Sequence, residues 1–210
     1  LAGSLANIET KKIMKALLSF LLIITLSNVT IAQTTAIPDS NFESRLISLG
    51  YDNILDGFVL TANINNVTTL NIRNKNISDI SGIEDFSSLS FLNCEYNQLD
   101  TLNFSQNTQL SSLICGYNQL ASIDISQNTL LTTLDFRHNQ ITNIDLSQNL
   151  LLTTLNFGNN QITNIDLSQN LSLSSLDCTY NPMSNVDVSL NVNLTYFKIS
   201  DIQISSINLT

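Results

Sequence analysis

The sequence predicts a β-rich solenoid of parallel strands, built from 21-residue coils and closed by a short N-terminal helical cap. Three observations indicate this architecture. The stretch NQITNIDLSQN occurs unchanged at 139–149 and at 160–170, 21 positions apart. Apolar residues recur at fixed places in every unit from residue 70 onward, whereas apolar residues between 38 and 49 recur at helical spacing.

The first segment has the features of a secretory signal peptide. Three cations precede an apolar run at 16–26, namely Lys11, Lys12 and Lys15, and a small residue, Ala32, stands at a suitable cleavage point. A transmembrane helix is the alternative, but spanning needs about 20 apolar residues and this run is shorter. We therefore expect an upstream extension at 1–13, a natural start at Met14, and a signal peptide over 14–32.

Residues 33–69 are predicted to form the N-terminal cap. Three apolar residues lie at helical spacing within 38–49: Phe42, Leu46 and Leu49. Ser40 and Glu43 have the spacing of a capping box, and Gly50 follows as a stop signal. This helix is expected to cover the open core of the first coil.

Residues 70–210 are predicted to form six full coils and a partial one. The units begin at Leu70, Leu92, Leu113, Leu134, Leu155, Leu176 and Phe197, so the first step is 22 residues and every later step is 21. Each follows the pattern L-x-x-L-x-[FCI]-x-x-N-x-[LI], which is the leucine-rich repeat pattern at its usual period.

The spacing within a unit predicts which side chains are buried. Leu134 and Phe136 alternate along a strand and face inward, whereas Asp135 faces outward. Asn139 ends the strand, where its side chain can bond the backbone groups of the turn. Its equivalents are predicted to stack on it as a ladder: Asn97, Asn118, Asn160 and Asn181. A single coil cannot bury its apolar face, so the coils must stabilise one another.

The second half of each coil resembles the first. LNFGNN at 155 is followed ten residues later by IDLSQN at 165, and both end in an asparagine, Asn160 or Asn170. We infer two parallel strand arrays on opposite sides of the solenoid. Extended or 3₁₀ segments in the second half are the alternative, because short apolar alternations do not distinguish strand from coil.

The C-terminal end carries no recognisable cap. Ile202 replaces the ladder asparagine, and the sequence stops within a coil at Thr210. An uncovered solenoid end exposes core and strand edge. We expect the sequence to be part of a longer protein, monomeric if that end is capped.

The segment from IPDSNFESRLISLGYDNILDG at 37–57 to the L-x-C-x-x-N-Q-L repeats resembles secreted leucine-rich repeat proteins of the Bacteroidetes/Flavobacteria type. More distantly it is similar to internalin-like surface proteins. The resemblance covers about residues 33–210. It implies adhesion or recognition without a uniform ligand, and often a C-terminal sorting module, which this sequence lacks.

Two columns of outward side chains are the candidate binding surface. One contains Arg73, Glu95, Gly116, Arg137, Gly158 and Thr179; the next contains Asn74, Tyr96, Tyr117, His138, Asn159, Tyr180 and Asp201. Tyrosine gives a large contact area with little loss of entropy, and solenoid faces are common ligand surfaces. Phe91 and Ile114 are expected to add an apolar patch. The alternative is that the tyrosines merely cover the edge where strand meets turn.

A column of carboxylates provides weak candidates for calcium. Its members are 21 residues apart: Asp124, Asp145, Asp166 and Asp187. Calcium needs several oxygens converging on one ion, so the simpler interpretation is that each carboxylate bonds nearby backbone amides. YDNILDG at 51–57 has a faint likeness to an EF-hand loop, but Ile54 and Asn63 stand where ligands belong, which favours a plain turn.

Composition and the remaining reactive residues argue against several functions. The net charge is −9 with only 12% charged residues, which disfavours nucleic acid and anionic membranes as partners. Cys94, Cys115 and Cys178 take the inward position that Phe136 has elsewhere, as small buried apolar residues. His138 is the one histidine, without a triad around it. We expect neither an enzyme nor a cofactor, and no membrane insertion after signal removal.

The sequence thus predicts a secreted or cell-surface module that binds a protein or glycan through its exposed strand face. A structural spacer that displays a missing C-terminal module is the alternative, favoured by the near-identical fourth and fifth coils. Ice or mineral binding by hydroxyl pairs is a third and weaker possibility. These pairs are Thr132–Thr133, Thr153–Thr154 and Ser174–Ser175.

Overall fold

The computed structural model describes residues 11–15, 32–200 and 206–208. The chain divides into two compact units, residues 1–32 and 33–210. Residues 11–15 are helical, and the rest of the predicted signal peptide up to residue 31 lies outside the described residues. Among the residues that the structure describes, no helix has the length and apolar character needed to cross a membrane.

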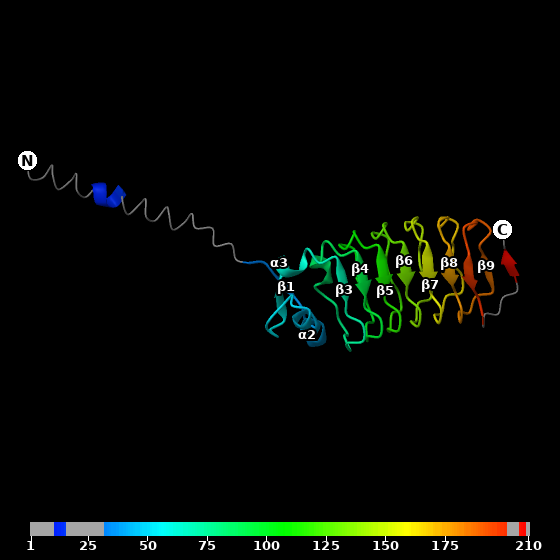
Figure 1. Ribbon diagram of the computed structural model, residues 1–210, viewed down its shortest axis with the longest axis horizontal. Coiled ribbons are helices and arrows are strands. Elements are labelled where there is room, and N and C mark those ends of the chain that lie inside the picture. The colour runs from blue at the N-terminus through cyan, green and yellow to red at the C-terminus, as the bar shows by residue number, and fades with distance from the viewer. Residues whose placement is uncertain (1–10, 16–31, 201–205, 209–210) are drawn as a thin grey trace, which may run out of the picture. The chain divides into compact units, whose positions relative to one another are not determined.

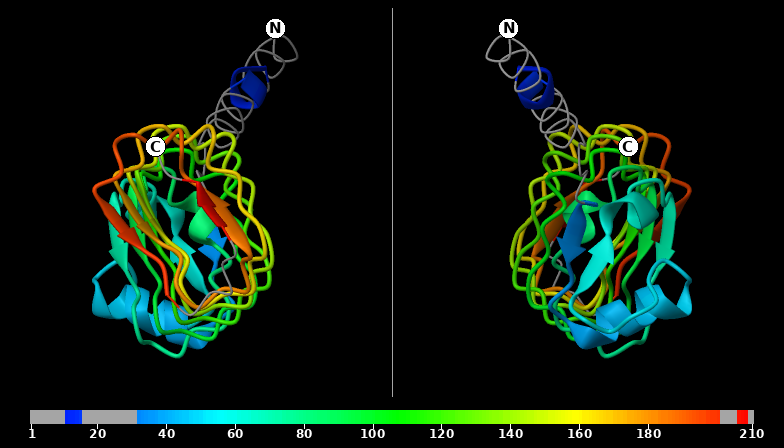
Figure 2. Two further views of the ribbon diagram at one scale, coloured as in Figure 1. Left: turned by 90° about the vertical axis from the view of Figure 1, so that its right-hand side faces the viewer. Right: turned by 90° about the vertical axis from the view of Figure 1, so that its left-hand side faces the viewer.

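The second unit is a stack of short coils, and one strand from each coil contributes to a seven-stranded parallel sheet (Figure 1). The strands, in spatial order, are β3 (Thr69–Asn71), β4 (Phe91–Asn93), β5 (Ser112–Ile114), β6 (Thr133–Asp135), β7 (Thr154–Asn156), β8 (Ser175–Asp177) and β10 (Tyr196–Lys198). Leu70 pairs with Leu92 and Leu134 pairs with Leu155, as the 22-residue first step and the 21-residue later steps predict. The leucine-rich repeat solenoid is therefore confirmed. Viewed end-on, successive coils lie almost behind one another (Figure 2).

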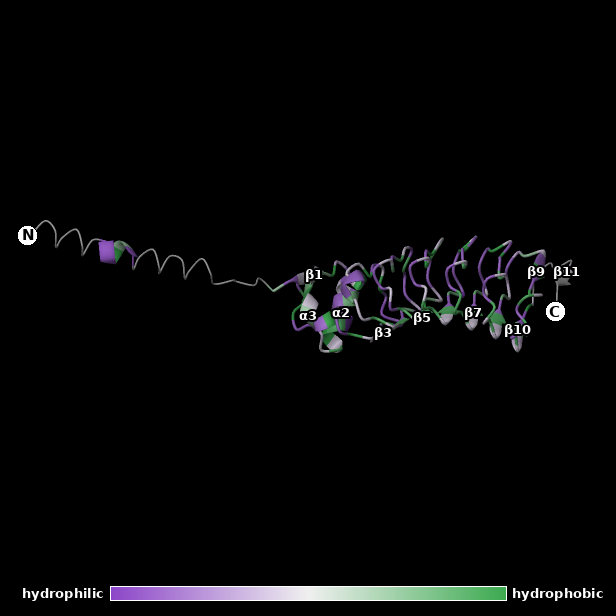
Figure 3. Ribbon diagram, turned by 90° about the horizontal axis from the view of Figure 1, so that it is seen from above, coloured by the Kyte–Doolittle hydropathy of each residue, from purple (hydrophilic) through white to green (hydrophobic). Residues whose placement is uncertain are grey.

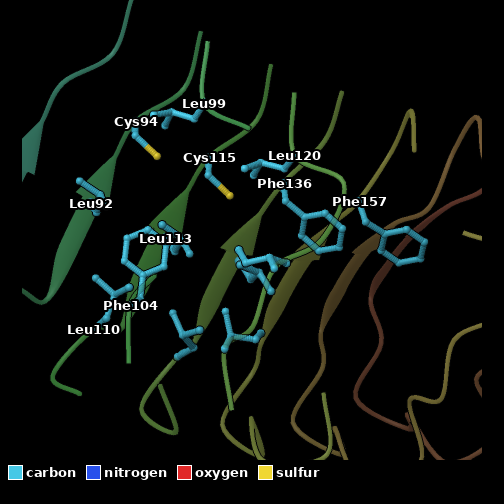
Figure 4. Close-up of a cluster of buried hydrophobic side chains, with 14 of the residues drawn as sticks. Leu92, Cys94, Leu99, Phe104, Leu110, Leu113, Cys115, Leu120, Phe136 and Phe157 are labelled. Atoms are coloured by element: carbon cyan, nitrogen blue, oxygen red, sulfur yellow. The ribbon is translucent and has the colours of Figure 1, made fainter. Parts of the chain in front are cut away.

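A continuous core runs through the coils because equivalent apolar residues stack. Phe136 and Phe157 are fully buried, with ring centroids 6.0 Å apart. Cys94 and Cys115 point into the same core from neighbouring coils, as Figure 4 shows. Along each coil hydrophobic and hydrophilic residues alternate, which keeps one set inside (Figure 3).

The three cysteines are free and buried, as predicted. Burial in the apolar core raises the pKa of the Cys94 thiol to about 12. The same cause raises the pKa of Cys178 to about 12 and that of Cys115 well above its ordinary value. These thiols are small core side chains and not reactive nucleophiles.

The predicted asparagine ladder is present and ties each coil to the one before it. Asn139 Oδ1 accepts from the backbone N–H of Leu120 at 3.0 Å. Its Nδ2 donates to the carbonyls of Cys115 and Phe136 at 3.2 and 2.9 Å. Asn160 repeats this arrangement one coil further on. Each amide thus satisfies backbone groups at the end of the strand, where no β-ladder partner is available.

The second half of the coil differs from the two-array prediction. A second parallel pair, β9 (Asn185–Asp187) with β11 (Ser206–Asn208), is present near the C-terminal end. In the earlier described coils the second halves contain turns and extended segments without strands, and the first contains a 3₁₀ helix, η1 (Ile83–Asp85). The alternative interpretation therefore holds for most of the solenoid, because these segments do not form a hydrogen-bonded ladder.

The N-terminal cap consists of β1 (Thr34–Ala36), α2 (Ser40–Ser48), β2 (Phe58–Leu60) and α3 (Thr61–Ile64), with β1 antiparallel to β2. The buried ring of Phe42 lies 6.4 Å from that of Phe86, so α2 covers the first coil as predicted.

The predicted capping box of α2 is wrong, because the residue that caps the helix is Asp39 and not Ser40. The Asp39 carboxylate accepts from the backbone N–H groups of Asn41 and Phe42 at 2.8 and 3.0 Å. Glu43 is 2% exposed and accepts three backbone N–H groups of the loop at 56–58. Its carboxylate therefore holds that loop and does not cap the helix.

Candidate functional site

The tyrosine and histidine column lies directly after the strands, in a left-handed backbone conformation. The φ angles are 57° at Tyr96, 54° at Tyr117, 53° at His138, 57° at Asn159 and 55° at Tyr180. The sequence predicted ordinary outward strand positions here. The chain instead turns at these residues to close the coil, although a positive φ is unfavourable for residues with a Cβ. Backbone bonds continue between coils, for example from Tyr96 N–H to the Gly116 carbonyl at 3.1 Å.

Three rings of this column form a continuous stack. The centroids of Tyr96 and Tyr117 are 4.1 Å apart at an interplanar angle of 11°, and those of Tyr117 and His138 are 4.0 Å apart at 18°. Asn159 interrupts the column, and its Nδ2 lies 3.4 Å from His138 Nε2. Beyond it, the Tyr180 side chain is 52% exposed. The structure therefore brings Tyr96, Tyr117 and His138 together and leaves Tyr180 separate.

Beside the stack, Glu95 joins two arginines from different coils. Its carboxylate contacts Arg73 Nε at 3.1 Å and Arg137 Nη2 at 2.6 Å. Arg137 can reach Glu95, two coils away, because Gly116 lies between them. A Cβ at Gly116 would be 3.1 Å from Arg137 Cγ and 3.0 Å from the Arg137 carbonyl oxygen.

Glu95 corrects the sequence prediction, because it is 4% exposed and is not an accessible ligand contact. Its carboxylate is ion-paired with the two arginines, and these arginines also contact the aromatic stack. The Arg73 guanidinium lies 4.8 Å from the Tyr96 ring centroid, and that of Arg137 lies 5.6 Å from the Tyr117 centroid. Glu95 therefore positions the arginines against the rings.

The charges around the stack change several proton affinities. Burial and the Arg137 cation lower the pKa of His138, so its imidazole is neutral at pH 7. A hydrogen bond with the Tyr96 side chain and burial raise the pKa of Tyr117. Burial also raises the pKa of Asp135, against the opposing effect of Arg137, whose Nη1 lies 3.1 Å away. The surface thus presents neutral rings and paired charges.

The predicted apolar pair lies on the outer face of the sheet. Phe91 and Ile114 begin β4 and end β5, respectively, and both are half-buried.

A shallow hollow lies at the opposite end of the stack from Arg73. Its lining comprises Tyr117, Arg137, His138, Asn156, Gly158, Asn159, Asp177, Thr179, Tyr180 and Lys198.

The aspartate column is engaged with the backbone. Asp124 Oδ1 accepts from the Ser126 N–H at 2.9 Å, and Asp145 and Asp166 accept likewise from Ser147 and Ser168. These hydrogen bonds lower the pKa of each carboxyl. Among the described residues, no three His, Cys, Asp or Glu side chains are grouped as a metal site. The calcium prediction gains no support from this geometry.

The loop at 51–57 is a turn in which Gly57 adopts φ 86° and Asp56 Oδ1 accepts from Phe58 N–H at 3.1 Å. The hydroxyl pairs are also partly engaged. Thr132 Oγ1 donates to the Ser111 carbonyl at 3.1 Å, and Thr153 Oγ1 donates to the Thr132 carbonyl at 3.0 Å. One hydroxyl of each of these pairs therefore serves the solenoid backbone.

Comparison with known proteins places the fold among leucine-rich repeat folds. No family model matches the chain. Internalin J of Listeria monocytogenes serotype 4b (strain F2365) is 36% identical over 71 residues, which are 34% of this chain and 8% of that protein. The chain therefore corresponds to a small part of that relative's length.

Solved structures extend the similarity over most of the solenoid. The functional domain of InlJ from Listeria monocytogenes, which includes a cysteine ladder, has a TM-score of 0.56 at 27% identity, covering 84% of this chain and 50% of that chain. Internalin C2 from L. monocytogenes str. 4b F2365 has a TM-score of 0.61 at 23% identity, covering 86% and 99%. Internalin InlF from the same strain has a TM-score of 0.69 at 18% identity, covering 83% and 63%. The latter two show the fold alone. The chain is thus similar to internalins in its leucine-rich repeat architecture.

Proposed function

We propose that the chain is a secreted or surface-displayed binding module that recognises a protein or glycan through the outer strand face of its solenoid. The observation that carries this proposal is the stack of Tyr96, Tyr117 and His138. Three rings are held parallel at the surface in a backbone conformation that disfavours side chains with a Cβ. A coil could close with asparagine alone, as it does at Asn74 and Asn159.

The surroundings of the stack support recognition. Arg73 and Arg137 are fixed by Glu95, so the arginines and rings are preorganised and lose little entropy when a ligand binds. Tyrosine and arginine are the residue types that dominate binding energy in protein interfaces. The signal-like first segment and the similarity to internalins support display outside the cell.

The test is a binding screen of the folded chain against glycans and surface proteins. A variant with alanine at Tyr96, Tyr117 and Tyr180 should lose the binding found for the wild type. The matched control carries alanine at three exposed apolar residues elsewhere on the coils, Leu150, Leu151 and Leu171, which are 51%, 48% and 51% exposed. This control should keep the affinity.

Two results would count against the proposal. Binding that survives the tyrosine triple variant would move the site away from this face. A folded chain that binds no member of either panel would favour the spacer interpretation, which the near-identical fourth and fifth coils already suggest.

A further inference from the structure

A ridge of exposed apolar side chains lies where the second half of each later coil turns toward the next strand. This leucine ridge consists of residues that are 41–73% exposed: Leu130, Leu150, Leu151, Leu171, Leu190 and Val192. Leu150, Leu171 and Val192 are 21 residues apart, so the stacking of coils places them about 4.8 Å from one another. Contiguous exposed apolar surface marks an interaction site, whereas isolated exposed leucines do not.

The solenoid does not need apolar residues at these turns. Thr108 and Gln109 occupy the places of Leu150 and Leu151 two coils earlier, and both are exposed. The backbone hydrogen bond of the turn is the same in the two coils, from Leu110 N–H to Asn107 O at 3.0 Å and from Leu152 N–H to Asn149 O at 3.2 Å. The leucines therefore add nothing to the closure of the coil that polar residues do not provide.

The aspartate column adjoins the leucine ridge. Asp166, Asp187 and Leu190 line one hollow, so carboxylates and ridge share a surface. The only lysine or arginine between residues 76 and 197 is Arg137, and this residue lies on the strand side, where it pairs with Glu95. The ridge is thus bordered by a row of negative charge without a lysine or arginine from its own coils.

The turns do not need the negative charge either. Asn103 stands at the place of Asp145 two coils earlier, and its Oδ1 accepts from Ser105 N–H at 3.1 Å. Asp145 Oδ1 makes the same bond to Ser147 N–H at 2.8 Å. A neutral amide therefore forms this turn, whereas carboxylates in neighbouring coils also repel one another. The hydrogen bonds lower the pKa of Asp145, so its carboxylate is ionised at pH 7.

We propose that the leucine ridge and the aspartate column together bind a basic amphipathic helix of a partner protein. The apolar face of the helix packs on the leucines, and its lysines or arginines lie against the carboxylates. This surface is separate from the tyrosine stack, so the inference does not depend on the proposed function.

The dimensions of the ridge favour a helix that lies along the solenoid axis. One helical turn rises about 5.4 Å and one coil step is about 4.8 Å, so each coil meets one turn of the helix. Over the three coil steps of the ridge the two repeats drift by only about 2 Å. A helix about 10–12 Å wide also covers the leucines and the adjoining carboxylates together.

Other partners fit this surface less well. The N–H groups of Asn149 and Leu152 already donate within the coil, so this turn offers them to no added strand. A helix satisfies its own backbone and needs only side-chain contacts. A second copy of this chain carries the same row of carboxylates and a net charge of −9, and it would be repelled.

The first variant removes charge and keeps the turns. Asp145→Asn combined with Asp166→Asn should preserve the hydrogen bonds to the following serines, as Asn103 does. The matched control is Asp79→Asn combined with Asp100→Asn. It removes the same charge from exposed positions in the earlier coils, outside the aspartate column.

The second variant removes the apolar contact. Leu150→Thr combined with Leu151→Gln copies the residues of the earlier coil, Thr108 and Gln109, at exposed positions of the same turn. The tyrosine triple variant is the control here, because it alters only the aromatic face.

The probe is a helical peptide of about 18 residues, about 27 Å long, with leucines on one face and lysines on the adjoining face. Fluorescence anisotropy with the full chain measures its binding. Leu150→Thr with Leu151→Gln should weaken binding by about tenfold or more. Asp145→Asn with Asp166→Asn should weaken it by about fivefold at low salt, and this difference should disappear at high salt. Both controls should bind as the wild type does.

Four results would overturn the inference. They are failure of the wild type to bind the peptide, equal binding of a peptide with glutamate in place of lysine, equal losses in both aspartate double variants, and full binding by the leucine double variant. Loss of binding in the tyrosine triple variant would also place the peptide on the aromatic face and not on the ridge. The proposed function is tested separately, since its ligand should be lost in the tyrosine triple variant and kept in the leucine double variant.

Discussion

Each of the two sides of one coil carries a buried asparagine, but the side-chain hydrogen bonds of that asparagine differ between the sides. On the strand side, the amide of Asn139 donates to two carbonyls and its oxygen accepts from Leu120 N–H. On the opposite side, the amide of Asn149 donates to the carbonyls of Ile125 and Asn128 at 3.1 and 2.9 Å. Its Oδ1, however, is buried without a donor among the described residues, as are those of Asn107, Asn128 and Asn170.

This difference shows that a ladder of asparagines does not by itself make a sheet. On the strand side the side-chain ladder continues a backbone ladder, and both the oxygen and the nitrogen of each side-chain amide form hydrogen bonds. On the opposite side the carbonyls already have backbone partners, since Asn128 N–H donates to Ile125 O and Leu131 N–H donates to Asn128 O. There the side chain adds a second bond to groups that are satisfied without it.

Asn139→Ala tests the strand side and should have the largest effect. It leaves the buried N–H of Leu120 without its acceptor and removes two further hydrogen bonds. We expect a loss of about 3 kcal/mol in the free energy of unfolding, since an unsatisfied buried group costs about 1–3 kcal/mol. Urea denaturation followed by circular dichroism measures it, and a loss near zero would show that the ladder is dispensable.

Asn149→Ala tests the opposite side and should cost less, about 1 kcal/mol, which is typical of a hydrogen bond whose loss leaves no buried group unpaired. The substitution also removes the unpartnered Oδ1. The same denaturation experiment gives the comparison directly. Equal losses for the two variants would contradict the distinction between the two sides.

The smallest expected effect is a change in pKa, which NMR titration measures. It distinguishes the two sides of the coil by the cause that lowers the pKa on each side. The pKa of His138 is lowered by burial and by Arg137, whereas the pKa of Asp145 is lowered by hydrogen bonds from Ser147. Arg137→Met should raise the pKa of His138 and leave that of Asp145 unchanged. A shift of both pKa values would indicate a rearranged fold and not a local charge effect.

The lowered pKa of His138 also fixes the sign of its effect on stability. Below the unfolded pKa of about 6.5, the unfolded chain binds a proton that the folded chain still lacks. The contribution of His138 is therefore present in full above that pH and declines as the pH falls toward the folded value. Arg137→Met should reduce this decline.

The register of the solenoid could be predicted to the residue because it depends on a single period. Leu70, Leu92 and Leu113 pair as their spacing requires, and Phe136 lies against Phe157. The strand-side hydrogen bonds of Asn139 also followed from its place at the end of the strand. These features are repeated in every coil, so a pattern in the sequence carries them.

The features that the period did not predict depend on individual neighbours. Glu95 is buried because Arg137 reaches across Gly116, a contact over two coils that a repeat of 21 residues does not encode. Alternation predicted a strand position for Tyr96, but the chain bends at this residue. The point of bending is set by closure of the coil, which alternation does not encode. Strand pairing in the second halves requires a hydrogen-bonding approach that apolar alternation leaves undetermined.

The two coils that share NQITNIDLSQN are interchangeable in structure, which has a consequence for how this molecule can change length. Unequal recombination between the two identical stretches would remove or add 21 residues as one intact unit, leaving every other pairing in place. Loss of residues 139–159 would join His138 directly to Asn160, delete Asn159, and bring Tyr180 to the position next to the histidine. Copy number alone would then decide whether the surface offers an interrupted or an unbroken row of rings.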